Sequence, residues 1–132
     1  MAPRALDSAA HASLDATRTL CLARSFVAGK VRNARSLLLR GAREAKSEDV
    51  ARQLTRQAQN LAASLRALPD CADLDTLRGT EGEAARQHFV GLSLLVRPDA
   101  REHFHLNDGR SRRPPRDRLN ALLSFLYSLW MN

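Results

Sequence analysis

The sequence predicts an all-α fold, a helical bundle, and three observations support this prediction. Apolar residues recur every three or four positions, which is the period of an amphipathic helix. Long stretches rich in Leu, Ala and Arg contain no proline and favour helix. The alternating pattern of a half-buried β-strand is absent from the sequence. The 132 residues suit one domain, and a hydrophobic content of 44% excludes a disordered chain.

The first expected helix covers residues 14–46, which contain no proline. We expect residues 1–13, which precede it, to be disordered. One face of this helix is apolar and one neighbouring arc is basic, so we expect the helix to pack on one side and present positive charge beside it. The apolar stripe consists of Leu20, Ala23, Val27, Val31, Ala34 and Leu38. The basic arc consists of Arg24, Arg32, Arg35, Arg43 and Lys46.

Two further helices are expected over residues 47–68 and 70–96. Ser47 is the expected N-cap of the second helix, and Pro69 ends that helix. The third helix carries two polar residues, Glu81 and His88, where its period requires apolar ones. Its stripe consists of Leu74, Leu77, Glu81, Ala84, Ala85, His88, Leu92 and Leu95.

The C-terminal part of the chain is expected to form a basic loop over residues 97–117 and a last helix. Asp117 is the expected N-cap of that helix. Residues 119–131 are apolar nearly all round, which is typical of a helix buried on every side. Because a central helix rarely ends a domain, we interpret the C-terminus as incomplete.

The charge of the chain points to an anionic partner, of which nucleic acid is the commonest. Lys and Arg number 21 against 14 Asp and Glu, for a net charge of +7. Two lone cysteines exclude a disulfide scaffold. No basic-then-apolar leader opens the chain, and residues 119–131 are too few to cross a bilayer, so we expect a cytoplasmic protein without a membrane partner.

Glu81 is the first candidate for chemistry, because a carboxylate on an apolar stripe is costly to bury unless it is paired, protonated or bound to a metal. Its position between Gly79 and Gly82 suits a ligand of a hard cation such as Mg²⁺ or Mn²⁺. The alternative is that the helix breaks at Gly79 and Glu81 begins the next one. His88 is either a second ligand or, more often for such a position, a hydrogen-bonded core histidine.

The densest positive charge lies in residues 110–118, where five of nine residues are arginine. Guanidinium groups bind phosphates bidentately, and the absence of interleaved aromatic residues favours contact with the backbone over base readout. The alternative is a merely solvated loop. The candidate phosphate contacts are Lys30, Arg110, Arg112, Arg113 and Arg116.

Four blocks of sequence, in matching order and spacing, resemble one family. They are residues 28–35 (AGKVRNAR), 77–89 (LRGTEGEAARQHF), 110–115 (RSRRPP) and 120–127 (NALLSFLY). These blocks are similar to the CRISPR-associated endonuclease of the adaptation module, Cas-one, the integrase that inserts new spacers in prokaryotic antiviral defence. The resemblance covers residues 14–132 and is closest to the forms found in type I systems.

The resemblance implies a helical catalytic domain that follows an N-terminal β-domain. It implies a homodimer that assembles with Cas-two around DNA, namely the spacer precursor and the CRISPR repeat. It also implies a metal-dependent nuclease and integrase in which Glu, His and Asp hold Mg²⁺ or Mn²⁺. The Glu of the family motif falls on Glu81, which is therefore the expected catalytic residue and metal ligand.

The departures from the family pattern define what we expect of these 132 residues. The chain corresponds to the front half of the helical catalytic domain, without the β-domain and without residues matching the catalytic His and Asp. We therefore expect this polypeptide to be inactive alone. Two alternatives stay open: a non-catalytic, basic helical module that binds DNA, and a helical interaction protein that docks a partner through its last helix.

Overall fold

The computed structural model describes residues 3–106 and 109–131 of the chain, and within them it contains helices and no strand. This confirms the prediction of an all-α fold. The helices are α1 (Pro3–Glu44), α2 (Glu48–Ala67), the 3-10 turn η1 (Leu68–Asp70), α3 (Leu74–Leu95), α4 (Pro98–Arg101) and α5 (Arg118–Met131).

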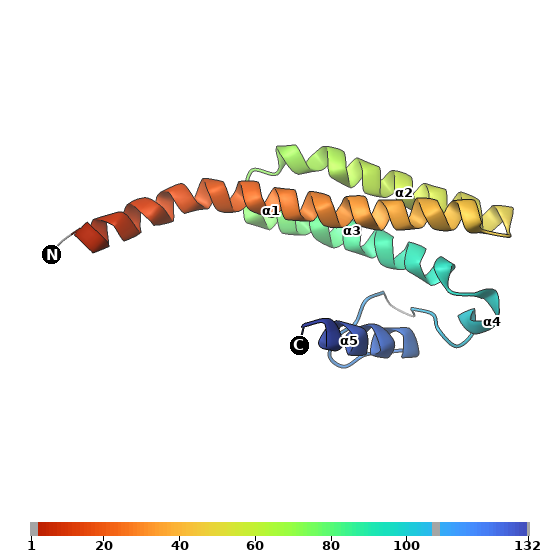
Figure 1. The fold of residues 1–132 in the computed structure, drawn as a ribbon. Helices are drawn as coiled ribbons and strands as arrows, with labels where there is room; N and C mark the ends of the chain where they lie inside the picture. The colour runs from red at the N-terminus through yellow and green to blue at the C-terminus, as the bar shows by residue number, and fades with distance from the viewer. Residues whose placement is uncertain (1–2, 107–108, 132) are drawn as a thin grey trace.

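The three long helices form the body of the molecule (Figure 1). α1, α2 and α3 lie side by side, and the N-terminal part of α1 projects beyond the other two. The connection that contains α4 then leads away from the end of α3, and α5 lies to one side of the three-helix bundle. The bundle and the α5 region are therefore two distinct parts of the fold.

Capping side chains define where the helices begin. Ser47 is the N-cap of α2 and accepts a hydrogen bond from the N–H of Val50, as predicted. Asp73 caps α3 in the same way, with 2.7 Å between its Oδ1 and the N of Thr76. The α2 helix ends at Ala67, just before Leu68 and Pro69 form the 3-10 turn η1.

The core of the bundle is aliphatic and is built by the predicted stripe of the first helix together with Leu54, Ala58 and Leu61 of α2. The buried face of α3 shares Leu77 and Ala84 with the predicted stripe but is rotated toward Gln87 and Gly91. Its buried residues are Leu77, Ala84, Gln87 and Gly91, so Glu81 and His88 lie at the border of the buried face and are half-buried. The fully or nearly fully buried apolar residues are Val27, Val31, Leu38, Leu54, Ala58, Leu61, Leu68, Cys71, Leu77, Ala84 and Leu119.

Two glycines allow α1 and α3 to approach each other closely. A Cβ atom on Gly91 of α3 would lie 2.6 Å from Cδ2 of Leu38, and one on Gly41 of α1 would lie 2.1 Å from Cδ2 of Leu95. Each helix thus inserts a leucine over a glycine of the other. Because such distances are far inside van der Waals contact, larger residues at 41 and 91 require the core to shift.

Three expectations differ from the structure. The α5 helix is not buried on every side: only Leu119 and Asn120 are buried, because the apolar stripes of the bundle are occupied by one another and the described residues place no layer over α5. The α1 helix begins at Pro3, where we expected disorder through residue 13; the Ala-rich segment after Pro3 contains no helix breaker. The expected loop over 97–117 contains the short helix α4.

Candidate functional site

Glu81 lies on α3 and forms an ion pair with Lys30 of α1 through its Oε1 atom. The side chains retain 34% and 68% of their exposed area, respectively. The structure thus brings together two of the residues that sequence analysis selected. Because α3 is continuous from Leu74 to Leu95, the alternative of a helix break at Gly79 is wrong. A Cβ on Gly79 or Gly82 would meet no atom within 4 Å, so no described segment approaches the backbone there.

His88 is separated from Glu81 by two turns of α3, or about 10 Å along the helix axis. Its ring contacts that of Phe89, with 5.2 Å between the centroids. Burial lowers the pKa of the His88 imidazole, so the neutral form predominates at neutral pH. Nδ1 is buried and has no hydrogen-bond partner among the described residues.

The residues around Glu81 do not fit a divalent ion on their own. Mg²⁺ and Mn²⁺ need several oxygen or nitrogen donors around one point. Among the side chains that the structure describes, those of residues 15–106 and 109–131, no group of three or more His, Cys, Asp or Glu could hold a metal ion. The carboxylate of Glu81 is moreover paired with an ammonium group. These residues supply one ligand and not a metal centre.

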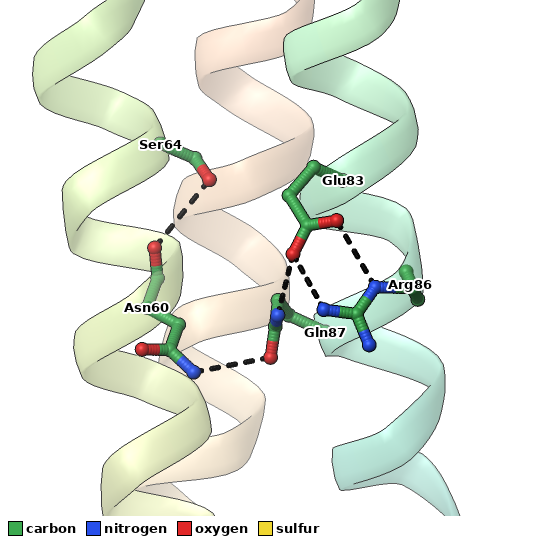
Figure 2. A network of polar contacts seen from close by, with 5 residues as sticks. All are labelled: Asn60, Ser64, Glu83, Arg86 and Gln87. Atoms are coloured by element: carbon green, nitrogen blue, oxygen red, sulfur yellow. Dashed lines mark hydrogen bonds and ion pairs between the residues drawn. The ribbon is translucent and has the colours of Figure 1, made fainter.

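A network of polar side chains joins α2 to α3 beside this site (Figure 2). Asn60 donates from Nδ2 to Oε1 of Gln87 over 3.1 Å, and Gln87 donates from Nε2 to Oε1 of Glu83 over 2.6 Å. Arg86 binds both carboxylate oxygens of Glu83, at 3.0 and 2.7 Å. The hydrogen bonds from Arg86 and Gln87 lower the pKa of Glu83 to about 2. The network satisfies Gln87, a polar residue in the buried face of α3.

Arg110 has internal partners, although sequence analysis selected it as a phosphate contact. Its Nη1 donates to Oδ1 of Asn120 over 2.9 Å, and both terminal nitrogens lie 3.3 Å from Oγ of Ser124. The guanidinium also lies over the ring of Tyr127, 5.6 Å from the centroid. Burial lowers the pKa of Arg110, and the positive charge of Arg112 lowers it further. Phosphate binding by Arg110 requires these contacts to be broken.

The other arginines of the basic segment are exposed. Arg112, Arg113 and Arg116 are exposed, as are both prolines, in the segment between Ser111 and α5. They belong to the segment that leads into α5, whereas the Lys30–Glu81 pair joins α1 to α3 in the bundle. The structure therefore does not gather the predicted phosphate contacts into one cluster.

Sequence analysis missed Gln87, Asn120 and Ser124 as residues that organise the site. Asn120 is fully buried, and its side chain bonds to Gly109 and Ser111, on both sides of Arg110. A signal was available: a polar residue at the start of an otherwise apolar helix needs buried partners. Gln87 gave no such signal, because the period of α3 was assigned to a neighbouring face.

Fold and site together define a basic, all-helical domain in which the accessible carboxylate of Glu81 is paired with Lys30, and which carries an arginine-rich segment. The family model for CRISPR associated protein Cas1 matches residues 5–132. The chain belongs to this family, which confirms the resemblance to Cas-one found in the sequence.

Curated relatives agree with the family match. The chain is 48% identical over 128 residues to a CRISPR-associated endonuclease Cas1 of Moorella thermoacetica, a match that covers 96% of this chain and 37% of the relative. It is 42% identical to one of Chlorobaculum tepidum (85% and 32% covered) and 39% identical to one of Leptospira interrogans (84% and 43%). The chain thus spans a third to two fifths of the length of these relatives.

No solved structure is significantly similar to the chain. Within the described residues, no helix is both long and apolar enough to cross a membrane.

Proposed function

We propose that this chain contributes part of the catalytic domain of a DNA endonuclease and integrase that acts in CRISPR spacer acquisition. The observation that carries the proposal is the Cas1 family match over residues 5–132, to relatives named as endonucleases. The proposed setting is the cytoplasm of a prokaryote. The proposed partners are DNA (the spacer precursor and the CRISPR repeat), Cas-two, and a second copy of the full-length protein.

In this proposal Glu81 is one catalytic ligand of Mg²⁺ or Mn²⁺. Such an ion, when bound, activates a hydroxyl or water for attack on a phosphodiester. Glu81 supports the role by its place in the family motif and by the 34% of its side chain that stays accessible. Because the described residues do not complete a metal centre, we assign no reaction step to them. We propose that the 132 residues alone do not cut DNA.

The first test is to sequence the coding DNA on both sides of this reading frame and to assay the protein it encodes. We expect a continuation that supplies a histidine and an aspartate, and cleavage of labelled DNA only with Mg²⁺ or Mn²⁺. Glu81→Gln is expected to lower cleavage by at least about 100-fold while DNA binding persists, because one metal ligand is lost. Cleavage at the normal rate by Glu81→Gln refutes the role of Glu81.

A second candidate function, non-catalytic DNA binding by these 132 residues, is favoured by the exposed arginines 112, 113 and 116. It predicts that the chain binds duplex DNA equally well with a chelator present and loses affinity as salt rises. The logarithm of affinity is expected to fall with the logarithm of salt concentration by about 0.9 for each phosphate contact. Fluorescence anisotropy with labelled duplex measures this slope, and binding that needs a divalent ion contradicts this candidate.

A third candidate, a helical interaction protein, rests on the exposed apolar side chains of α5. Phe125 is 59% exposed and Trp130 is 87% exposed. This candidate predicts that the chain forms oligomers. The Trp130→Lys substitution is expected to dissociate them and Glu81→Ala to leave them intact, as measured by analytical ultracentrifugation. A monomer at all concentrations excludes it.

A further inference from the structure

The basic segment is tied to α5 by one buried asparagine. The Oδ1 atom of Asn120 accepts hydrogen bonds from the Arg110 guanidinium and from the N–H of Ser111, each over 2.9 Å. Its Nδ2 donates to the carbonyl of Gly109 over 2.9 Å and to Oδ2 of Asp117 over 2.8 Å. Asn120 thus holds the chain on both sides of Arg110, and its side chain uses both donors and both acceptor positions.

The backbone around Arg110 is shaped for this contact. Gly109 has a φ of +77°, a left-handed conformation that glycine adopts without steric cost. This conformation lies directly before Arg110, whose side chain reaches Asn120 and Ser124 on α5. We name the set of contacts made by Arg110 and Asn120 the Arg110–Asn120 clasp.

The segment that follows the clasp, residues 111–116, is closed by a hydrogen bond between its first and last residues. The backbone N–H of Arg116 donates to Oγ of Ser111 over 3.0 Å. Ser111 itself is held by Asn120. Residues 111–116 therefore form a loop whose two ends are bonded to each other and to α5. Its exposed members are two prolines and the arginines 112, 113 and 116.

We propose that the Arg110–Asn120 clasp preorganises residues 111–116 as a loop that binds the phosphate backbone of duplex DNA. Arg112, Arg113 and Arg116 contact the phosphates, and Arg110 is a positioning residue that acts through Asn120. The inference rests on the proposed binding of DNA and names the loop that carries it. A fixed loop loses less conformational entropy on binding than a mobile one, so the clasp raises affinity without adding a contact.

The clasp is tested first without DNA, by amide hydrogen exchange of the whole chain. Asn120→Ala is expected to increase exchange at Ser111 and Arg116 by at least about tenfold, because the acceptor for the first and the anchor for the second are lost. Arg110→Lys is expected to do the same, because an ammonium cannot reproduce the fork of the guanidinium. Unchanged exchange in α1–α3, with unchanged helicity by circular dichroism, shows that the bundle is intact. Unchanged exchange at Ser111 in both variants overturns the clasp.

The second test measures DNA affinity against salt concentration by fluorescence anisotropy. Asn120→Ala keeps every arginine, so we expect affinity to fall about tenfold at each salt concentration with an unchanged slope. Arg112→Ala is the matched control: it removes a contact, so the slope is expected to fall by about 0.9. Arg110→Lys, which keeps the charge, is expected to behave like Asn120→Ala.

The opposite pattern overturns the proposal. If Asn120→Ala and Arg110→Lys bind like the unaltered chain while Arg110→Ala lowers the slope by one contact, Arg110 itself is the phosphate ligand. If the unaltered chain binds no duplex DNA, the phosphate-binding role of the loop fails together with the DNA-binding candidate, whereas the exchange result still decides whether the clasp exists.

Discussion

The three-helix bundle and the α5 region are held together by different forces. In the bundle, apolar side chains from all three helices are buried, and leucines 38 and 95 lie over glycines of the facing helix. In the α5 region, Leu119 and Asn120 are the buried residues of the helix. Hydrogen bonds between the side chain of Asn120 and residues Gly109 and Arg110 join α5 to the preceding segment. Apolar packing defines the first region, and polar contacts define the second.

This difference teaches where each region tolerates change. A close-packed core responds to volume, because cavities and overlaps both cost free energy. A hydrogen-bonded segment responds to the loss of a single donor or acceptor, because the partner left behind is unsatisfied. The apolar side chains of Phe125, Leu129 and Trp130 in α5 take part in neither, since they are mostly exposed.

The largest expected effect is in the bundle. Leu38→Ala removes a side chain that is fully buried and is expected to lower the free energy of unfolding by about 2–5 kcal/mol. The matched change Leu126→Ala, at a side chain that is 49% exposed, is expected to alter it by less than about 0.5 kcal/mol. Urea unfolding followed by circular dichroism measures both values. Equal losses contradict the assignment of the core to α1–α3.

Smaller changes in the free energy of unfolding are expected when two glycines of α3 are replaced by alanine, and the two changes are expected to have opposite signs. A methyl group on Gly91 overlaps Leu38, at 2.6 Å from one of its terminal carbons. Overlap in a core costs about 1–3 kcal/mol and outweighs the gain in helix propensity of about 1 kcal/mol. Gly91→Ala therefore destabilises by about 1 kcal/mol.

Gly82 is the control for Gly91, because a methyl group there meets no atom within 4 Å. Gly82→Ala is expected to stabilise the bundle by about 0.5–1 kcal/mol through helix propensity alone. Thermal unfolding of the two variants side by side checks the signs. A shift of the same sign in both variants excludes the close approach of α1 and α3 at position 91.

Much of the bundle could be predicted from the sequence, because its signals are local. Ser47 is followed directly by acidic residues and an apolar period, and it caps α2 as expected. Val27, Val31 and Leu38 repeat at helical spacing and are buried. The position of Glu81 next to Lys30 was not predicted as a pair, since the register between α1 and α3 depends on the Leu–Gly contacts and not on either helix alone.

The α5 region shows what periodicity cannot predict. Arg110 reads as a surface charge in a run of arginines, and only the path of the chain from Gly109 reveals that it turns inward to Asn120. The apolar sequence of α5 predicts burial, yet burial requires a neighbouring layer that the sequence of one helix does not specify. The roles of Glu81, Arg112, Arg113 and Arg116 stay predictions that the proposed experiments test.

The smallest expected effect concerns the polar network that joins α2 to α3. The carboxyl of Glu83 has a pKa of about 2 in the folded protein, below the ordinary value of about 4.3. A carboxyl whose pKa is lowered by folding stabilises the fold at any pH above its pKa in the unfolded state. This contribution is lost as the pH falls through its pKa in the folded state. We therefore expect the stability difference between the unaltered protein and Glu83→Gln to be full at neutral pH and to vanish between about pH 4.3 and pH 2.

Arg86→Met sharpens this test, because Arg86 makes the largest contribution to the lowered pKa of Glu83. In this variant the pKa of Glu83 is expected to rise toward its ordinary value, as measured by carbon NMR of the carboxyl group. Arg52→Met is the matched control on α2, where Arg52 faces Asp49 at 3.6 Å through one nitrogen. A pKa of Glu83 that stays near 2 without Arg86 shows that Gln87 alone holds the carboxylate.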